Sequence, residues 1–271
     1  TAEQLFLPAI RESERRETFE QLLAAAEDAG IPVSYIKCGD EIRDSQLRLL
    51  CLHPEENTTL ADANAYSECF YVEVFAKKMK QEAIDDRKAN DASGASAIGK
   101  ISILLTGDVE GEGERQLTQK LQALQESQSL QESRSLQESR LLQESRSLQE
   151  SQSLQESQSL QESRSLQESQ SLQLTRRLQE QRGQREFRVD LLKVAHHGSG
   201  YSTGTEFLAT ASPATAIISC GRNNSYGHPH AETLQRLEDA RVPWYGTMDY
   251  GALTVTVDSH GNRLRGYLRR K

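Results

Sequence analysis

The sequence predicts an α/β layered fold, in which short buried strands alternate with amphipathic helices. Two apolar runs end abruptly in polar residues of the kind that bind ligands. The run 191–194 leads into His196 and His197, and the run 101–105 leads into Asp108. Open α/β sheets carry their sites at the carboxyl ends of their strands, so we expect these three side chains to share one site.

The amino-terminal part predicts one strand, one helix and three further strands. Residues 5–8 are a strand candidate closed by a proline, and apolar residues recur at helical spacing from Phe19 to Ala26. Gly30 and Pro32 then end this helix. Three more strands are expected at 33–36, 47–52 and 66–75. Residues 76–100 lack a sustained apolar period and predict a surface insertion.

A six-residue repeat rich in Ser, Leu, Gln and Glu follows the strand 101–105. A helix should begin near the acids of 110–114, because carboxylates favour a helix amino terminus. From 124 to 172 a leucine recurs every six residues, a step that turns an α-helix by about 240° net. The leucines therefore form no coiled-coil seam. A polar exposed helix, disorder and a stacked β structure remain as alternatives, in that order of preference.

Alternating elements resume after the repeat. Strands are expected at 187–194, 216–219, 242–245, 253–257 and 264–268, helices at 204–211 and 231–240, and a polar loop at 221–229. We divide the sequence into residues 1–120, the repeat 121–182 and residues 183–271, and the first and last of these form two parts of one domain.

Composition excludes several classes of protein. The formal net charge of −8 over 271 residues argues against a purely electrostatic nucleic-acid binder. The four cysteines are widely spaced without a Cys-x-x-Cys pair, which predicts buried free thiols. No run approaches the length of a membrane span and no signal peptide is present, so we expect the chain by itself to be soluble.

Histidines gather in the last third of the chain, at 196, 197, 228 and 230. Histidine is the commonest metal ligand and the usual acid or base near neutral pH, so the cluster predicts a site. Asp108 follows Thr-Gly, where a carboxylate can bridge two cations. The alternatives are that Gly-Asp forms an ordinary turn and that residues 223–230 form an Asx-turn leading into the next helix.

The segments 104–110, 191–199 and 219–229 resemble the carboxy-terminal metallo-β-lactamase-fold domain of ComEC-type competence proteins. Leu-Thr-Gly-Asp is common to many relatives, whereas His-His-Gly-Ser together with Tyr-Gly-His-Pro is more specific. Further likenesses lie at 52–54, 64–67 and 249–252. The resemblance implies an αββα sandwich with two divalent metal ions, Zn or Mn, at one edge. It also implies a hydrolase, a proposed nuclease, that acts during DNA internalisation in natural transformation.

The resemblance also implies roles for individual residues. Asp108 and His197 would be metal ligands, and His196 and His228 would be catalytic, with His196 either a further ligand or a proton donor to the leaving oxygen. Four further residues would bind substrate, namely Ser199, Asn224, Tyr226 and His230. The implied partners are single-stranded DNA, a membrane channel domain of the same parent protein and other competence proteins. The parent would lie at the bacterial inner membrane, with this domain outside the cytoplasm.

Two departures from the family pattern concern the metal ligands. The family's first ligand motif, of the form His-x-Asp-x-Asp-His, is absent, which predicts that the chain is truncated at its amino terminus. Asn64 stands where many relatives have a further ligand histidine. We therefore expect phosphodiester hydrolysis in the intact parent rather than in this chain by itself. The alternatives are another hydrolase of the same fold, acting on small esters or phosphodiesters, and a non-catalytic module that guides DNA.

Overall fold

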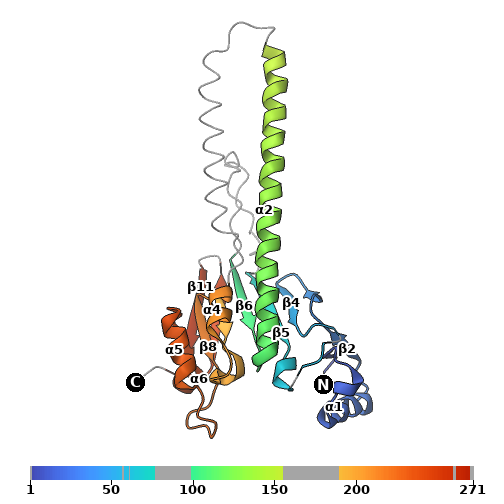
Figure 1. Ribbon diagram of the computed structural model, residues 1–271, viewed down its shortest axis with the longest axis vertical. Helices are drawn as coiled ribbons and strands as arrows, with labels where there is room; N and C mark the ends of the chain where they lie inside the picture. Colours follow the sequence, from blue (N-terminus) through green and yellow to red (C-terminus); the bar gives the residue numbers. More distant parts are fainter. Residues whose placement is uncertain are drawn as a thin grey trace, which may run out of the picture. The chain divides into compact units, whose positions relative to one another are not determined.

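The computed structural model describes residues 2–56, 58–60, 62–76, 99–154, 189–258 and 261–268. Its largest element is a seven-stranded mixed sheet with the strand order β3-β4-β5-β6-β7-β8-β9. The strands are β3 (Glu41–Arg43), β4 (Leu47–His53), β5 (Cys69–Phe75), β6 (Lys100–Leu105), β7 (Leu191–Lys193), β8 (Thr215–Ile218) and β9 (Trp244–Gly246) (Figure 1). Neighbours from β3 to β6 are antiparallel, and neighbours from β6 to β9 are parallel.

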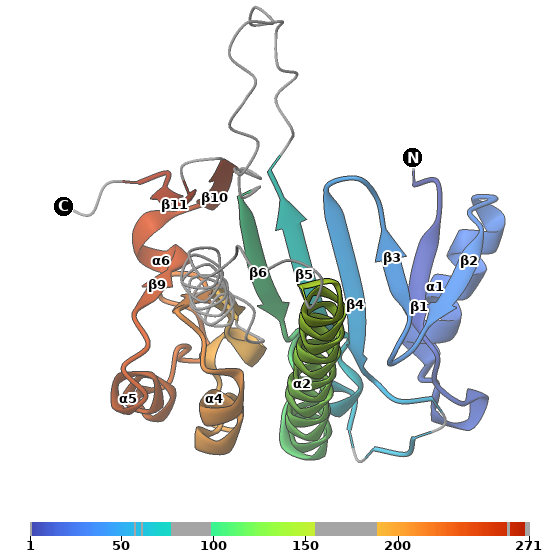
Figure 2. The ribbon, with the colours of Figure 1, turned by 90° about the horizontal axis from the view of Figure 1, so that it is seen from above.

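Two short strand pairs accompany the large sheet. β1 (Leu5–Pro8) and β2 (Val33–Ile36) are parallel and are connected through α1 (Glu17–Asp28). β10 (Leu253–Asp258) and β11 (Gly261–Gly266) are antiparallel. Figure 2 shows β1, β2 and α1 at the β3 end of the large sheet. The predicted α/β class is therefore confirmed at the level of a large mixed sheet with helices.

The core lies along the parallel strands, whose residues are mainly apolar. Leu104, Leu192 and Ile218 are fully buried on three neighbouring strands. Parallel strands are usually covered on both faces, which explains why their sequences are mainly apolar. The helices α4 (Thr205–Ala211) and α5 (Ala231–Asp239) add buried side chains such as Phe207 and Leu237.

Helix α2 (Gly111–Leu154) begins as predicted, with Glu112 and Glu114 in its first turn. Its early residues Leu117 and Leu121 are fully buried, whereas Leu130 and Leu141 are exposed. The repeat is thus helical as far as Leu154, and the rest of the predicted repeat lies outside the described residues. The chain forms two compact units, of which one is Thr1–Leu121 together with Val189–Lys271 and the other is Gln122–Arg188.

Several boundaries differ from the sequence-based expectation. β7 covers Leu191–Lys193, and it ends before the expected residue 194 because the backbone turns into a short 3-10 helix, η3 (Ala195–Gly198). Residues 187 and 188 of the expected strand lie outside the described residues. β3 and the short helix α6 (Thr247–Tyr250) were not predicted. Two further 3-10 turns are η1 (Glu12–Glu14) and η2 (Asn64–Tyr66). Most of the expected insertion at 76–100 lies outside the described residues.

All four cysteines are free thiols; Cys51 and Cys69 are buried as predicted, whereas Cys38 and Cys220 are partly exposed. Burial raises the pKa of the Cys51 thiol to about 12, so this group stays protonated at neutral pH. None of the helices in the described part of the chain is long and apolar enough to cross a membrane.

Candidate functional site

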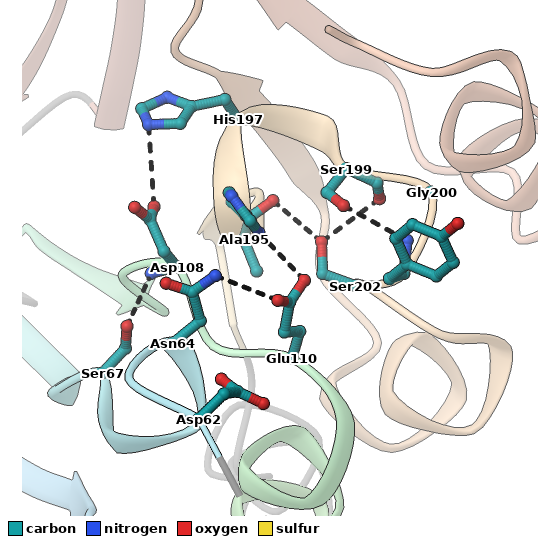
Figure 3. A network of polar contacts seen from close by, with 12 residues as sticks. Asp62, Asn64, Ser67, Asp108, Glu110, Ala195, His197, Ser199, Gly200 and Ser202 are labelled. Atoms are coloured by element: carbon teal, nitrogen blue, oxygen red, sulfur yellow. Dashed lines mark hydrogen bonds and ion pairs between the residues drawn. The ribbon is translucent and has the colours of Figure 1, made fainter. Parts of the chain in front are cut away.

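The candidate site lies at the edge of the large sheet where β6, β7 and β8 end. These strands are parallel, so their carboxyl ends meet at the same edge. Asp108 follows β6, His196 and His197 follow β7, and Ser219 follows β8. The expected convergence of the first two strand ends is observed, because Nε2 of His197 lies 3.7 Å from Oδ1 of Asp108 (Figure 3).

The backbone of the histidine pair is left-handed. φ is +46° at His196, +56° at His197 and +87° at Gly198, a conformation that costs free energy for residues other than glycine. Surrounding contacts hold it in place, among them a hydrogen bond from the N–H of His196 to the carbonyl of Gly107 at 3.1 Å. A Cβ at position 198 would lie 2.7 Å from Cβ of Pro229, so only glycine fits there.

One ring nitrogen of His197 has a fixed partner. Its Nδ1 lies within hydrogen-bond distance of the Ser219 carbonyl, and a carbonyl can only accept, so Nδ1 carries a proton. Nε2 of the same ring faces the Asp108 carboxylate. The backbone N–H of Asp108 donates to Oγ of Ser67 at 3.1 Å, which fixes the turn after β6. One carboxylate and one imidazole nitrogen are thus presented toward each other.

Lys193, the last residue of β7, adds a cation to this edge. Its Nζ donates to the Gly107 carbonyl at 2.5 Å and lies 3.5 Å from Oδ1 of Asp108. Burial lowers the pKa of the Lys193 ammonium, and the neighbouring Asp108 carboxylate opposes this shift. Sequence reasoning overlooked this residue, although a charged side chain within an apolar strand was a visible signal.

His196 is held by a different set of partners. Its Nδ1 lies 2.9 Å from Oε2 of Glu110, and Oε1 of Glu110 accepts a hydrogen bond from Nδ2 of Asn64 at 3.0 Å. Asn64, expected at the place of a ligand histidine, therefore orients the Glu110 carboxylate. Glu110 was part of the quoted motif, but sequence reasoning did not single it out. The rings of His196 and His197 meet edge to face, at a centroid distance of 6.4 Å.

His53 supports Asn64 from within the core. This histidine is fully buried, and its Nε2 lies 2.6 Å from the carbonyl of Ala65. Burial lowers the pKa of the His53 imidazole, which favours the neutral ring. A Cβ at Gly113 would lie 2.3 Å from the same carbonyl, so η2 and α2 approach closely only because this residue is glycine.

His228, predicted to be catalytic, lies among the other imidazoles. Its ring centroid is 5.6 Å from that of His196 and 6.3 Å from that of His197. Burial first, and then the neighbouring histidines, with His230 the foremost, lower the pKa of His228. Tyr226 stacks near-parallel on His228 at 5.9 Å. The structure thus gathers three histidines around the Asp108 edge, and their catalytic roles stay predictions.

The loop that carries His228 is closed by Asn224. Oδ1 of Asn224 accepts from the N–H of His228 at 3.0 Å. Nδ2 of Asn224 donates to the carbonyls of Gly221 at 2.9 Å and of His228 at 2.6 Å. The bond to the N–H of His228 spans four residues, so it is not the two-residue Asx-turn considered from the sequence, and no side chain caps α5 at His230. A substrate contact for Asn224 stays a prediction.

The other residues predicted to bind substrate have different surroundings. Nδ1 of His230 accepts from the N–H of Gly200 at 2.9 Å, so the proton is on Nε2, which donates to the Tyr226 carbonyl at 3.1 Å. Ser199 is buried, and its Oγ accepts from the N–H of Tyr201 at 3.3 Å. Of the four residues predicted to bind substrate, Tyr226 is the most exposed to solvent.

The donor set can be compared with what a metal centre requires. Asp108 and His197 fit as two ligands, because carboxylates and imidazoles are common metal ligands in proteins. The second nitrogen of a metal-binding imidazole usually donates to a carbonyl or a carboxylate, as Nδ1 of His197 does here. Among the residues that the structure describes, no group of three or more His, Cys, Asp or Glu side chains could hold a metal ion. The described residues thus present a pair of ligands and do not fit a complete two-ion centre.

Comparison with known proteins found two relatives that match part of the chain. ComE operon protein 3 of Bacillus subtilis is 48% identical over 83 residues, 26% of this chain. Recombination protein 2 of Haemophilus influenzae is 44% identical over 50 residues, 18% of this chain. No family profile matches. The matches span 11% and 6% of the lengths of these relatives, so the chain is similar to a small part of each.

Proposed function

We propose that this chain is part of a competence protein for DNA uptake, and that the Asp108–His197 edge belongs to a site that hydrolyses phosphodiester bonds in DNA. The observation that carries the proposal is the pairing of the Asp108 carboxylate with Nε2 of His197, 3.7 Å apart, while Nδ1 of the same ring bonds to the Ser219 carbonyl. The names of the two relatives refer to the ComE operon and to recombination, which supports a role in handling DNA.

The chain's own residues would do three things in such a site. Asp108 and His197 would hold a divalent ion, Zn or Mn, together with ligands from outside the described residues. A bound ion of this kind supplies a Lewis acid for the phosphate and an activated water. His196, oriented by the Glu110 carboxylate at 2.9 Å, would hold a proton beside the leaving oxygen. Lys193 would balance the charge of Asp108.

Metal binding and DNA cleavage test the proposal separately. Titration of the purified chain with Zn and with Mn should show binding that Asp108→Ala and His197→Ala each weaken. The matched control is Asp239→Ala, which removes an exposed carboxylate of α5. In the full-length protein, the same two site variants should abolish metal-dependent cleavage of DNA. Cleavage by either variant at the wild-type rate would refute the assignment.

A non-catalytic module that guides DNA is the second candidate. It is favoured by the absence, among the described residues, of a third metal ligand and by the position of Lys193, whose ammonium already lies beside Asp108. This candidate predicts that the full-length protein binds DNA without metal and cleaves none when Zn or Mn is added. A membrane channel domain of the same parent at the inner membrane and other competence proteins would then be its partners.

A further inference from the structure

The Asp108 carboxylate already has a cation of the chain itself beside it. Nζ of Lys193 lies 3.5 Å from Oδ1 of Asp108, and the same oxygen lies 3.7 Å from Nε2 of His197 (Figure 3 shows the second of these contacts). A metal ion held between the carboxylate and the imidazole would meet this oxygen as well. The ammonium and such an ion would therefore compete for one carboxylate oxygen.

A second acceptor holds the ammonium at this place. Nζ of Lys193 donates to the Gly107 carbonyl at 2.5 Å, and the N–H of His196 donates to the same carbonyl at 3.1 Å. If the ammonium left, the carbonyl would keep its bond from His196. Departure of the ammonium therefore leaves no acceptor of the turn unpaired, which keeps its cost low.

The backbone of Lys193 is fixed, whereas its side chain can move. As the last residue of β7, Lys193 pairs with Leu105 on one side and with Ile217 on the other. Its carbonyl also accepts from Oγ1 of Thr106 at 2.6 Å. The side chain is 24% exposed and ends in a flexible four-carbon stem. The ammonium can thus turn toward water while the strand stays in place.

Charge makes the two cations alternatives to each other. Among the ion pairs of the described residues, Lys193 is the one Lys or Arg partner of Asp108. This pair is only partly open to water, since the Asp108 side chain is 41% exposed. An ammonium and a divalent ion at one carboxylate would repel each other, and the remaining water would screen the repulsion incompletely.

We infer that Lys193 is an internal counter-cation that competes with a divalent metal ion for the Asp108 carboxylate, so that the ion binds only when the ammonium leaves. This inference rests on the proposed function, since it concerns the same edge. Lys193 would keep Asp108 neutralised until an ion arrives, and it would set how tightly the edge binds Zn or Mn. It also gives a physical reason why the described residues hold together without a complete metal centre.

The test titrates the full chain with Zn and with Mn in a calorimeter at neutral pH. Lys193→Met removes the charge and keeps a side chain of similar length. This variant should bind each ion roughly tenfold more tightly than the wild type. Lys193→Arg keeps a positive charge at the same position and should bind neither ion more tightly than the wild type does.

Lys100→Met is the matched control. Nζ of Lys100 lies 2.6 Å from Oε1 of Glu73, so this variant also removes an ammonium from a carboxylate and changes the net charge equally. Lys100 is the first residue of β6, at the end of the strand opposite to Asp108. Because the change lies away from the site, the variant should bind Zn and Mn as the wild type does.

A second measurement follows the ammonium directly. The wild-type chain is treated with an amine-reactive acetylating reagent, and the modified lysines are identified by mass spectrometry. Labelling of Lys193 should rise when the chain is saturated with Zn, because the ammonium no longer contacts Asp108. Labelling of Lys100, measured in the same sample, should stay unchanged.

Four results would overturn the inference. They are Lys193→Met binding no more tightly than the wild type, an equal gain in Lys100→Met, no binding by either wild type or Lys193→Met, and labelling of Lys193 that Zn leaves unchanged. If Asp108→Ala abolishes cleavage in the full-length protein while Lys193→Met binds as the wild type does, the proposed function stands and the competition does not. If Lys193→Met binds more tightly and Asp108→Ala cleaves normally, the opposite holds.

Discussion

The two histidine-bearing loops at the sheet edge are built in different ways. The β7 loop (residues 195–204) is held by side chains far away in the sequence, Glu114 of α2 and Arg236 of α5. The β8 loop (residues 219–230) contains three hydrogen bonds of its own Asn224, and it also bonds to Thr247, to Met248 and to the β7 loop. Side chains of two helices hold the first loop, whereas a side chain of the loop itself forms the hydrogen bonds within the second.

Backbone conformation shows the same contrast. The β7 loop has positive φ at His196, His197 and Thr203, residues that rarely adopt it. In the β8 loop the non-glycine residue with positive φ is Asn223, which tolerates this conformation well. Strain is thus concentrated in the loop that long-range contacts hold. The side chains of His196 and His197 thus owe their position near Asp108 to contacts of the β7 loop with other elements of the fold.

The largest effect is expected from Arg236→Ala. This variant removes the guanidinium that bonds to three carbonyls of the β7 loop, and those partly buried acceptors lose charged donors. We expect the free energy of unfolding to fall by about 3 kcal/mol. Urea unfolding followed by circular dichroism measures it. Gln235→Ala, at an exposed position of the same helix, should change stability by less than about 0.5 kcal/mol, and equal losses in both variants would contradict this account.

Glu114→Ala should have the next largest effect. It removes the acceptor of two N–H groups at the end of the β7 loop, those of Thr203 and Gly204. We expect a loss of about 2 kcal/mol in the free energy of unfolding. Glu114→Gln keeps one carbonyl oxygen and should lose less. If the alanine and glutamine variants were equally stable at pH 7, the carboxylate would not be the group that anchors this loop.

Asn224→Ala tests the locally built loop. Three hydrogen bonds within residues 221–228 disappear, but the loop is accessible to water, which replaces part of them. We expect a loss of about 1 kcal/mol or less. Amide hydrogen exchange should quicken within 221–228 and stay unchanged within 200–204. Faster exchange in both loops would show that they are coupled more strongly than their contacts indicate.

The smallest effect is a pH dependence of the anchor of the β7 loop. Burial raises the pKa of Glu114 above its usual 4.5, against the effect of its two backbone hydrogen bonds. The folded protein therefore binds this proton more tightly than the unfolded chain does. Protonation of Glu114 therefore stabilises the folded state below pH 4.5, and this contribution is lost as the pH rises through the raised folded pKa. Relative to Glu114→Gln, the wild type should lose stability from pH 4.5 upward in urea titrations, and a gain would be the wrong sign.

Much of the secondary structure followed from local patterns. The strands at 5–8 and 33–36 are found where the sequence predicted them, and the helix with acids in its first turn begins as expected. Apolar runs and helix signals act over a few residues, so they can be read directly. β3 was missed because Glu41–Arg43 is a short polar edge strand, which has neither alternation nor burial.

The candidate site was predicted less completely. Histidines and Asp108 at strand ends were visible in the sequence, and the structure brings Asp108 and His197 together. Lys193, Glu110 and Glu114 were not recognised, because each acts on a partner on the other side of the repeat. Such pairs exist only after the strands have aligned and the helices have packed.

The sequence by itself determined most of the strands and helices, the start of the long helix, and which residues stand at the strand ends. These properties depend on side-chain periodicity and on residue types that are near one another in the chain. Only the tertiary structure decided the hydrogen bond of His197 Nδ1 to the Ser219 carbonyl, the orientation of Asn64 toward Glu110, the left-handed turn at the histidine pair, and the link through His230 between the β7 loop and the β8 loop. Each of these depends on a hydrogen-bond partner that the folded chain brings within about 3 Å, and no local pattern specifies which partner that is.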